Sequence, residues 1–440
     1  MKSTISILIL SLVTLCTVQL KGNCCSEIQA QIVTLFSSEG PINPMGGLVQ
    51  DSDGNLYGTT SYGGAELDVG SIFVVSNSGQ YQVLHYFDVD DGFYPRTGLT
   101  QCTNGLLYGT TDSTIFRINA AGEFATVFTF QNTNGTGPMG DLLFAQDGNF
   151  YGTTEYSEPG SGTVFKMNPS GSLTTLAMFD DTNGAEPCGR LVQDADKNLY
   201  GVTVRGGSFG SGVIFQCTPA GHLNVLHSFR GTDGEYPSGG LLQCSNGDFY
   251  GTTSFGGEYG FGTVFKLDTN GTLTTLLSFN ETNGSYPQSS LIQCHNGDLY
   301  GTTLDGGVYD WGTVFKIDTN GDLTTVVSFD GTNASSPYAG LIIANDGNLY
   351  GTTYLGGYNE AGAIYRLVTA PKITSIVPSS NTMTLTWSAF TNGNYRVDFT
   401  TNLEGSWTAI GNVTATNNVT SFTTPGQDGN QGFYRIELRP

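Results

Sequence analysis

The chain has 440 residues, and only 12% of them are charged, about half the usual share for a soluble globular protein. Its 38 acidic and 16 basic residues give a net charge of −22, which argues against sequence-independent binding to nucleic acid or anionic lipid, because both need a Lys- and Arg-rich surface. The 62 glycines indicate many turns, and 38% hydrophobic residues suffice for a large core.

The N-terminus has the layout of a secretory signal peptide. Lys2 precedes an apolar run, Ile5–Leu20, which is shorter than the roughly 20 residues that span a bilayer. We assign residues 1–22 to the signal, with an uncleaved N-terminal anchor as the alternative. No later segment is long and apolar enough to cross a membrane, so we expect a secreted or cell-surface protein. Seven cysteines follow the signal, so at least one is unpaired.

An internal repeat occupies most of the chain. The motif Tyr-Gly-x-Thr recurs at intervals of 51, 43, 49, 50, 50 and 50 residues, and six copies read Tyr-Gly-Thr-Thr. The seven copies begin at Tyr57, Tyr108, Tyr151, Tyr200, Tyr250, Tyr300 and Tyr350. Such a period is typical of stacked structural units.

Each unit predicts four short strands. In the clearest copy they are Leu241–Cys244, Phe249–Thr253, Thr263–Asp268 and Leu273–Phe279. Asn246-Gly247 and Asn270-Gly271 mark tight hairpins, and the last strand alternates apolar residues toward one face. A glycine inside the second strand would normally weaken it, so we expect the adjacent sheet to approach there too closely for a Cβ.

Four strands repeated every 50 residues predict an all-β fold, a seven-bladed β-propeller over residues 23–369. The seventh unit lacks a fourth strand after Val368. Gln31–Phe36 matches a fourth strand, so we expect this N-terminal strand to close the ring by joining the last blade.

The repeat resembles the GloVer tandem-repeat family of exported bacterial proteins. The resemblance rests on Leu-Tyr-Gly-Thr-Thr, Gly-Gly, Gly-Thr-Val-Phe-Lys, Leu-Thr-Thr-Leu and Ser-Phe, and covers Gln31–Val368. It implies a β-propeller exported to the cell surface or medium, and it implies no catalytic residue. The spacing is also similar to that of kelch blades, although the kelch Trp is absent.

The composition changes after Thr369. Residues 372–440 show alternating segments that contain Trp387, Tyr395 and Tyr434, and predict about six strands. They resemble a small fibronectin-type-III-like or immunoglobulin-like β-sandwich. We expect Trp387 and Trp407 to belong to its core.

Loop lengths place the candidate site. The links between the second and third strands, and those between blades, are long, and in a propeller both emerge on one face. Aromatic side chains beside Asp and Asn suit sugar rings, with packing between blades as the alternative. From these loops we select Tyr259, Tyr309 and Trp311 as candidate ligand-binding residues.

Three of the nine arginines, Arg190, Arg205 and Arg230, fall in or beside the fourth unit on that face. They could bind a carboxylate or sulfate, or pair with local acids such as Asp180 and Glu186.

Motifs for catalysis or metal binding are absent from the sequence. Three Asp-rich segments lack the Glu of a calcium loop, and His85 and His227 fall in distant units. We therefore predict no metal, no cofactor and no catalytic residues, in a monomer that binds a glycan or a surface protein. The alternatives are a polysaccharide-active hydrolase or lyase that uses carboxylates, and a structural surface or adhesion component.

Overall fold

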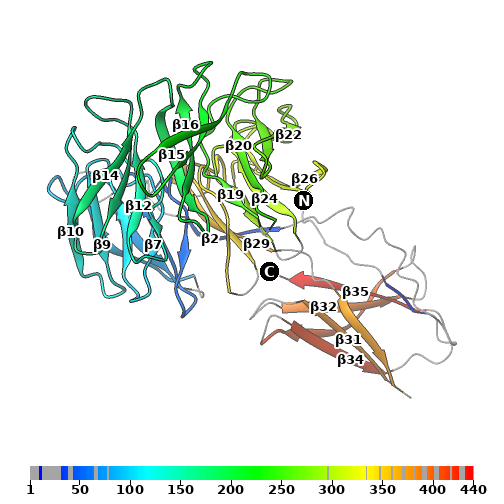
Figure 1. Ribbon diagram of the computed structural model, residues 1–440. Helices are drawn as coiled ribbons and strands as arrows, with labels where there is room; N and C mark the ends of the chain where they lie inside the picture. The colour runs from blue at the N-terminus through cyan, green and yellow to red at the C-terminus, as the bar shows by residue number, and fades with distance from the viewer. Residues whose placement is uncertain are drawn as a thin grey trace. The chain divides into compact units, whose positions relative to one another are not determined.

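The computed structural model describes residues 9–11, 31–37, 43–63, 68–76, 79–244, 246–294, 297–332, 334–345, 348–357, 360–368, 373–379, 382–388, 394–400, 406–416, 419–425 and 432–439 (Figure 1). All regular elements in these ranges are strands. The chain divides into two compact units. The repeat unit holds Ile32–Ala344 and Leu349–Arg366, and the other unit holds Met1–Gln31, Asn345–Asn348 and Leu367–Pro440.

The repeat unit contains seven antiparallel sheets of four strands. The first three are β3 (Val49–Gln50), β4 (Leu56–Thr60), β5 (Ser71–Val75) and β6 (Tyr81–Tyr86); β7 (Thr100–Gln101), β8 (Leu107–Thr110), β9 (Thr114–Ile118) and β10 (Phe124–Thr129); and β11 (Leu143–Phe144), β12 (Phe150–Thr154), β13 (Thr163–Met167) and β14 (Leu173–Met178). The next three are β15 (Ala185–Gln193), β16 (Leu199–Arg205), β17 (Val213–Cys217) and β18 (Leu223–Ser228); β19 (Leu242–Gln243), β20 (Phe249–Thr253), β21 (Thr263–Leu267) and β22 (Leu273–Ser278); and β23 (Ile292–Gln293), β24 (Leu299–Thr303), β25 (Thr313–Ile317) and β26 (Leu323–Ser328).

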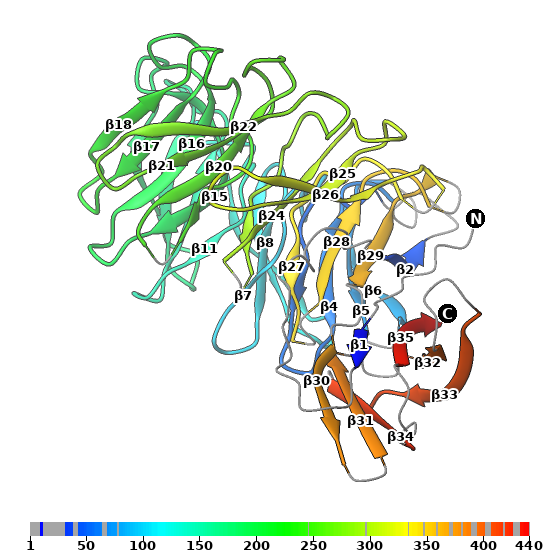
Figure 2. The same ribbon diagram turned by 90° about the vertical axis from the view of Figure 1, so that its right-hand side faces the viewer.

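The seventh sheet joins the two ends of the repeat unit. Its strands are β27 (Ile342–Ile343), β28 (Leu349–Thr353), β29 (Ala363–Val368) and β2 (Gln31–Ser37), in that order (Figure 2). The N-terminal strand thus takes the fourth place, beside β29, where the repeat pattern predicts it.

The sheets pack face to face in chain order. Buried clusters join the first sheet to the second, the second to the third, the third to the fourth, the fourth to the fifth and the fifth to the sixth. Phe329 after the sixth sheet packs edge-on against Tyr365 of the seventh. A cluster with Ile364 and Phe73 returns the packing from the seventh sheet to the first. The arrangement is propeller-like, since each sheet buries its two faces against its neighbours.

The expected reason for the glycine in the second strand is wrong. A Cβ on Gly251 would lie 2.5 Å from Cζ of Phe265, which is on β21 of the same sheet, not the adjacent one. The same contact recurs at Gly301, where Phe315 is 2.6 Å away. The glycine therefore makes room for an aromatic ring that crosses it from the neighbouring strand.

The expected alternation of the fourth strand is also interrupted. Val264 pairs with Leu277, whereas Phe265 pairs with Thr275, so Leu276 is an extra residue in β22. This β-bulge makes Leu276 and Leu277 both pack against the core, while Thr275 is exposed. The bulge recurs in five other sheets.

The other unit has two sheets. One contains β30 (Ile373–Pro378), β31 (Thr382–Ser388) and β34 (Val419–Pro425). The second contains β32 (Asn394–Thr400), β33 (Thr408–Thr414), β35 (Gly432–Arg439) and β1 (Ile9–Ser11). Trp387 is fully buried, whereas Trp407 is half-buried under the guanidinium of Arg435, 4.8 Å from its ring centroid.

The N-terminus and the cysteines are described in part. Apart from Ile9–Ser11, the proposed signal peptide lies outside the described residues, as do Cys16, Cys24 and Cys25. The five described cysteines are free, and four of them are buried: Cys102, Cys188, Cys217 and Cys244. Within the described ranges, none of the elements is a helix with the length and hydropathy of a membrane span.

Candidate functional site

Two sets of long loops interlock on one side of the repeat unit. The loop that leads into a sheet pairs with the loop between its second and third strands, as in the bridges Glu235–Phe255, Ser285–Asp305 and Ser335–Leu355. Tyr236 N–H also donates to the carbonyl of Ser211 in the preceding sheet, at 3.0 Å. We call this side the loop face. The other connections within the sheets are tight turns, such as Asp268–Thr272, where Thr272 N–H donates to the Asp268 carboxylate.

The loops hold a strained backbone position in sheet after sheet. The residue before the proline of the loop has a positive φ of 53° at Tyr94, 57° at Glu186, 54° at Tyr236, 56° at Tyr286 and 53° at Ser336. Left-handed geometry is costly for a side chain other than Gly and persists only where the surroundings enforce it. Because it recurs from sheet to sheet, it belongs to the scaffold, and it fixes the direction of the side chain at this position.

Exposed aromatic rings recur on the loop face. Phe209, Tyr259 and Tyr309 stand two residues after the Gly-Gly pair in the fourth, fifth and sixth sheets, and they are 59%, 52% and 58% exposed. Trp311, in the same loop as Tyr309, is 44% exposed. The predicted residues Tyr259, Tyr309 and Trp311 therefore present their rings to solvent.

Other loop aromatics pack against each other. Phe255 lies between Tyr236 and Tyr286, with ring centroids 5.8 and 4.9 Å away. Tyr62 similarly contacts Tyr94 at 5.4 Å. The tyrosines that precede proline thus serve the packing between loops. Tyr358, also in a loop of this class, lies outside the described residues.

The structure places the three predicted arginines in different surroundings. Arg205 Nε lies 3.3 Å from Glu186 Oε2, and its guanidinium is 5.9 Å from the Tyr236 ring centroid. Arg230 Nε lies 3.6 Å from Asp233 Oδ2. Arg190 is exposed, and among the described residues it forms no ion pair. No contact joins any two of these arginines within the described part of the chain.

A charged cluster that was not predicted from the sequence lies on the same face. Its members are Arg96, Asp112, Glu155 and Glu186. Arg96 Nε is 3.5 Å from Asp112 Oδ1, and Tyr156 OH donates to Glu155 Oε1 at 2.6 Å. These residues come from three successive sheets and the loops that lead into them.

Two carboxyl groups of this cluster, those of Asp112 and Glu155, have raised pKa values. Burial raises the pKa of Asp112, and the nearby Arg96 opposes the rise. Burial also raises the pKa of Glu155, and the negative charges of Glu186 and Asp112 add to this effect, while Tyr156 and Arg96 oppose it. The hydrogen bond to Glu155, followed by burial, raises the pKa of Tyr156 to about 12. The cluster therefore concentrates partly desolvated acids, as many functional sites do.

A signal for this cluster is present in the repeat. Asp112 and Glu155 both follow directly after the Tyr-Gly-Thr-Thr motif, at the position where other copies have residues such as Ser61, Val204, Ser254 and Leu304. Glu186 replaces the tyrosine that precedes proline in three copies. Alignment of the repeats at these positions identifies three neighbouring acids.

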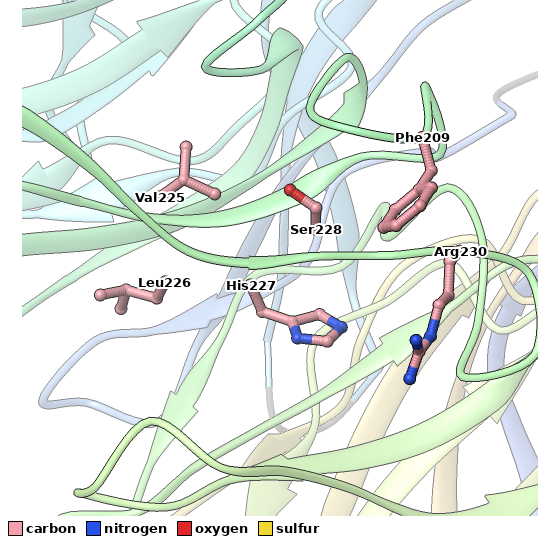
Figure 3. Close-up of a pocket in the computed structure, with 6 residues that line it drawn as sticks. All are labelled: Phe209, Val225, Leu226, His227, Ser228 and Arg230. Atoms are coloured by element: carbon pink, nitrogen blue, oxygen red, sulfur yellow. The ribbon is translucent and has the colours of Figure 1, made fainter.

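The outer strand of the fourth sheet borders a shallow groove of about 400 Å³ (Figure 3). It is lined by Phe209, Val225, Leu226, His227, Ser228 and Arg230. Phe209 and Arg230 lie at one end of the groove, and Val225 and Leu226 lie at the other (Figure 3). A volume of this size matches small-molecule sites.

The described residues include no group of three or more His, Cys, Asp or Glu that could hold a metal ion. His85 Nε2 lies 2.9 Å from Asp91 Oδ2, and His227 Nε2 lies 3.1 Å from Asp233 Oδ2. Each histidine thus pairs, from the fourth strand of its sheet, with an aspartate of the loop that follows that strand. Asp51 accepts hydrogen bonds from the backbone N–H of Asn55 and from Tyr57 OH, as a residue in a hairpin turn does.

Comparison with known proteins identifies the repeat. A family model described as the Gloeobacter/Verrucomicrobia repeat matches residues 112–246 and 222–432. No curated protein matches the chain.

Solved structures are similar in fold only. The extracellular domain of BT3049 from B. thetaiotaomicron is 14% identical, with a TM-score of 0.53 over 93% of this chain. The chain spans 55% of the length of that protein chain. XC5397 from Xanthomonas campestris, a gluconolactonase, is 12% identical, with a TM-score of 0.43 over 77% of this chain and 90% of its own. The latter score is too low to support an argument.

Proposed function

The chain belongs to the Gloeobacter/Verrucomicrobia repeat family, and from that premise we propose that it is an exported, non-enzymatic binding scaffold for a glycan. In this proposal the seven sheets are the blades of a β-propeller, spanning residues 23–369. Residues 1–22 are a signal peptide, and residues 372–440 form a fibronectin-type-III-like sandwich. The loop face binds the ligand.

One observation carries this proposal. Phe209, Tyr259 and Tyr309 present exposed rings at the same position of three consecutive loops, in a chain whose Phe and Tyr side chains are otherwise largely buried. A row of aromatic rings beside Asp and Asn can stack on the C–H faces of successive sugars, while the polar side chains bind their hydroxyls. A protein partner could also use exposed aromatic anchors, so it is an outcome of the test.

The test is binding of the full exported chain to a panel of neutral and acidic glycans. We expect Tyr259→Ala, Tyr309→Ala and Trp311→Ala each to weaken binding of the captured glycan about tenfold, since each removes one stacking ring. Val377→Ala is the matched control, because Val377 is a 55% exposed apolar residue in the other unit. Capture of no glycan, or unchanged affinity in all three variants, would contradict the proposal.

A second candidate is a polysaccharide-active hydrolase. Glu155 favours it, because a carboxyl with a raised pKa beside further carboxylates is the arrangement that general acid catalysis needs. Under this alternative, Glu155→Gln and Asp112→Asn abolish release of reducing ends from a bound polysaccharide and leave binding intact. The third alternative, a structural surface component, predicts neither binding nor cleavage.

A further inference from the structure

The groove beside β18 is lined by an arginine, Arg230, at a position where the neighbouring sheets have Asp180 and Asn280. It lies at the loop face, so a ligand assigned to it rests on the proposed glycan-binding function. Phe209 covers one end of it from the loop between β16 and β17, and Ser228 contributes a hydroxyl from the end of β18 (Figure 3). Ser208 N–H donates to Ser228 Oγ at 3.4 Å, which holds the loop against the strand.

Arg230 breaks the pattern of its repeat position. In the third, fifth and sixth sheets, this position holds Asp180, Asn280 and Asp330. Their side-chain oxygens accept hydrogen bonds from the loop that comes next in the chain, such as the one from Thr182 N–H to Asp180 Oδ1 at 3.1 Å. Arginine cannot accept these bonds. The fourth sheet therefore lacks the hydrogen bond that the Asp or Asn side chain accepts in the other sheets, and has an exposed cation in its place. Such a departure from the repeat is expected where a position serves a function.

Asp233 connects this arginine to the groove. Its Oδ1 accepts from Arg230 N–H at 3.0 Å, the role that Asn183 and Asn283 have in other sheets. Its Oδ2 lies 3.1 Å from His227 Nε2 and 3.6 Å from Arg230 Nε. This contact uses Nε2 of His227, so Nδ1 is the ring nitrogen left for a hydrogen bond to a ligand.

The arginine keeps most of its binding capacity. Its side chain is 63% exposed, and its contact with Asp233 is through Nε. The two terminal nitrogens can therefore take a planar carboxylate in bidentate fashion. The exposed Phe209 ring at the same end of the groove offers a surface for the C–H face of a sugar.

We propose that this groove binds a hexuronate residue of an otherwise neutral glycan. The Arg230 guanidinium binds the carboxylate, Phe209 stacks on the sugar ring, and Ser228 and His227 bind hydroxyls. The net charge of −22 disfavours a polymer with a carboxylate on every sugar, because long-range repulsion opposes its approach. A single acidic sugar gains the local contact with little of that repulsion.

The test uses a xylo-oligosaccharide that carries one glucuronate branch, and the same compound with its carboxyl reduced to an alcohol. Isothermal titration of the full chain should give at least tenfold tighter binding of the acidic compound. Arg230→Asn should remove this preference without loss of folding, because Asn280 occupies the position in the fifth sheet. Phe209→Ala should weaken both compounds. The controls are Arg117→Ala, an exposed arginine on β9, and His85→Leu, which removes the equivalent His–Asp pair of the first sheet.

The outcomes separate the two proposals. Equal affinity for the acidic and the reduced compounds, or an unchanged preference in Arg230→Asn, overturns the hexuronate inference. If Tyr259→Ala and Tyr309→Ala still weaken binding in that case, the glycan-binding function stands. If the chain binds neither these compounds nor any panel glycan, both proposals fall.

Discussion

The third and fourth sheets differ from the fifth and sixth in their polar contacts. In the fifth and sixth sheets, paired hydroxyls join the second and third strands, Thr253 to Thr263 and Thr303 to Thr313, each at 2.8 Å. A further threonine hydroxyl donates to the next sheet, from Thr302 to the carbonyl of Ala339 at 3.2 Å. These buried threonine hydroxyls therefore all have hydrogen-bond partners, within their own sheet or in the next one.

The third and fourth sheets have lost part of this network. The third sheet keeps the hydroxyl pair, Thr154 to Thr163 at 2.7 Å, but the buried hydroxyl of Thr153 has no hydrogen-bond partner. In the fourth sheet, Val202 and Val213 occupy threonine positions. The same sheets carry Glu155, Glu186, Arg205 and Arg230 on the loop face. All four sheets thus retain the apolar core, while the third and fourth sheets have fewer hydrogen bonds from buried threonine hydroxyls beside their charged residues. Such local departures are expected near functional sites.

The largest expected effect is the loss of stability on removing a core phenylalanine, and it should be equal in the fourth and the sixth sheets. Phe215 and Phe315 are fully buried at equivalent positions, so replacing either with Ala should lower the free energy of unfolding by about 3–5 kcal/mol. Guanidinium unfolding followed by fluorescence measures this. A much smaller cost for Phe215→Ala would mean that the cores are not equivalent.

The charged cluster should make the third sheet sensitive to pH. Because the pKa of Glu155 is raised in the folded chain, the folded state binds the proton more tightly, and stability falls as pH rises from the ordinary carboxyl pKa through the raised one. Glu155→Gln cannot ionise, so we expect a gain of about 0.5–2 kcal/mol at neutral pH, which disappears in acid. Thermal unfolding across pH tests this, with the exposed Glu258→Gln of the fifth sheet as control. A gain that is independent of pH would contradict the assigned cause.

The paired threonine hydroxyls should contribute less to the free energy of unfolding than the core phenylalanines do. Thr313→Val removes the pair in the sixth sheet and should cost about 0.5–1.5 kcal/mol. Val213→Thr places a hydroxyl opposite Thr203 in the fourth sheet and should be neutral or stabilising. The unfolding midpoints of the two variants test this prediction. A lower midpoint for Val213→Thr would show that the valine is required for packing.

The smallest effect should come from ion pairs that the third and fifth sheets share on their tight turns. Lys166 Nζ lies 2.9 Å from Asp147 Oδ2, and Lys266 Nζ lies 2.7 Å from Asp248 Oδ2. Burial raises the pKa of Asp147, but hydrogen bonds from Lys166, Tyr151 and Asn149 outweigh it and lower the pKa to about 2. This stabilisation is present above the ordinary Asp pKa and is lost as pH falls toward 2.

Lys166→Met and Lys266→Met should each cost less than about 1 kcal/mol at neutral pH, because the pairs are partly exposed. The cost for Lys166→Met should decrease as the pH falls below about 4, the ordinary Asp pKa. Thermal unfolding at matched pH values measures this loss of stability. A loss far above about 1 kcal/mol in either variant would mean that the ion pair has a larger structural role.

The sequence predicted the regular parts of the fold better than the candidate site. The bounds of β20 match the predicted strand Phe249–Thr253, because the Asn246-Gly247 turn before it and the Tyr-Gly-Thr-Thr signature within it define it. The extra residue Leu276 was not predictable, because a bulge depends on the partner strand rather than on local pattern. The role of Gly251 was misassigned for a related reason, since Phe265 lies on another strand and meets the glycine only through the register in which the two strands pair.

The charged cluster was missed because its members are far apart in the chain. Arg96, Asp112, Glu155 and Glu186 meet only after three sheets have packed in order, and each alone is an ordinary loop residue. Tyr259, Tyr309 and Trp311 were selectable because the repeat alignment placed them in equivalent loops. Their binding role stays a prediction.

The pairing of β2 with β29 has a consequence for how the molecule reaches its final form. The first strand of the repeat unit stays unpaired until the residues around 363–368 have been synthesised. Until then β2 has no partner strand, and unpaired strands invite association between chains. Contacts this distant in sequence also slow folding. A chain that stops before β29 would leave β2 without a partner and one edge of β28 open, so synthesis of β29 protects the product from association.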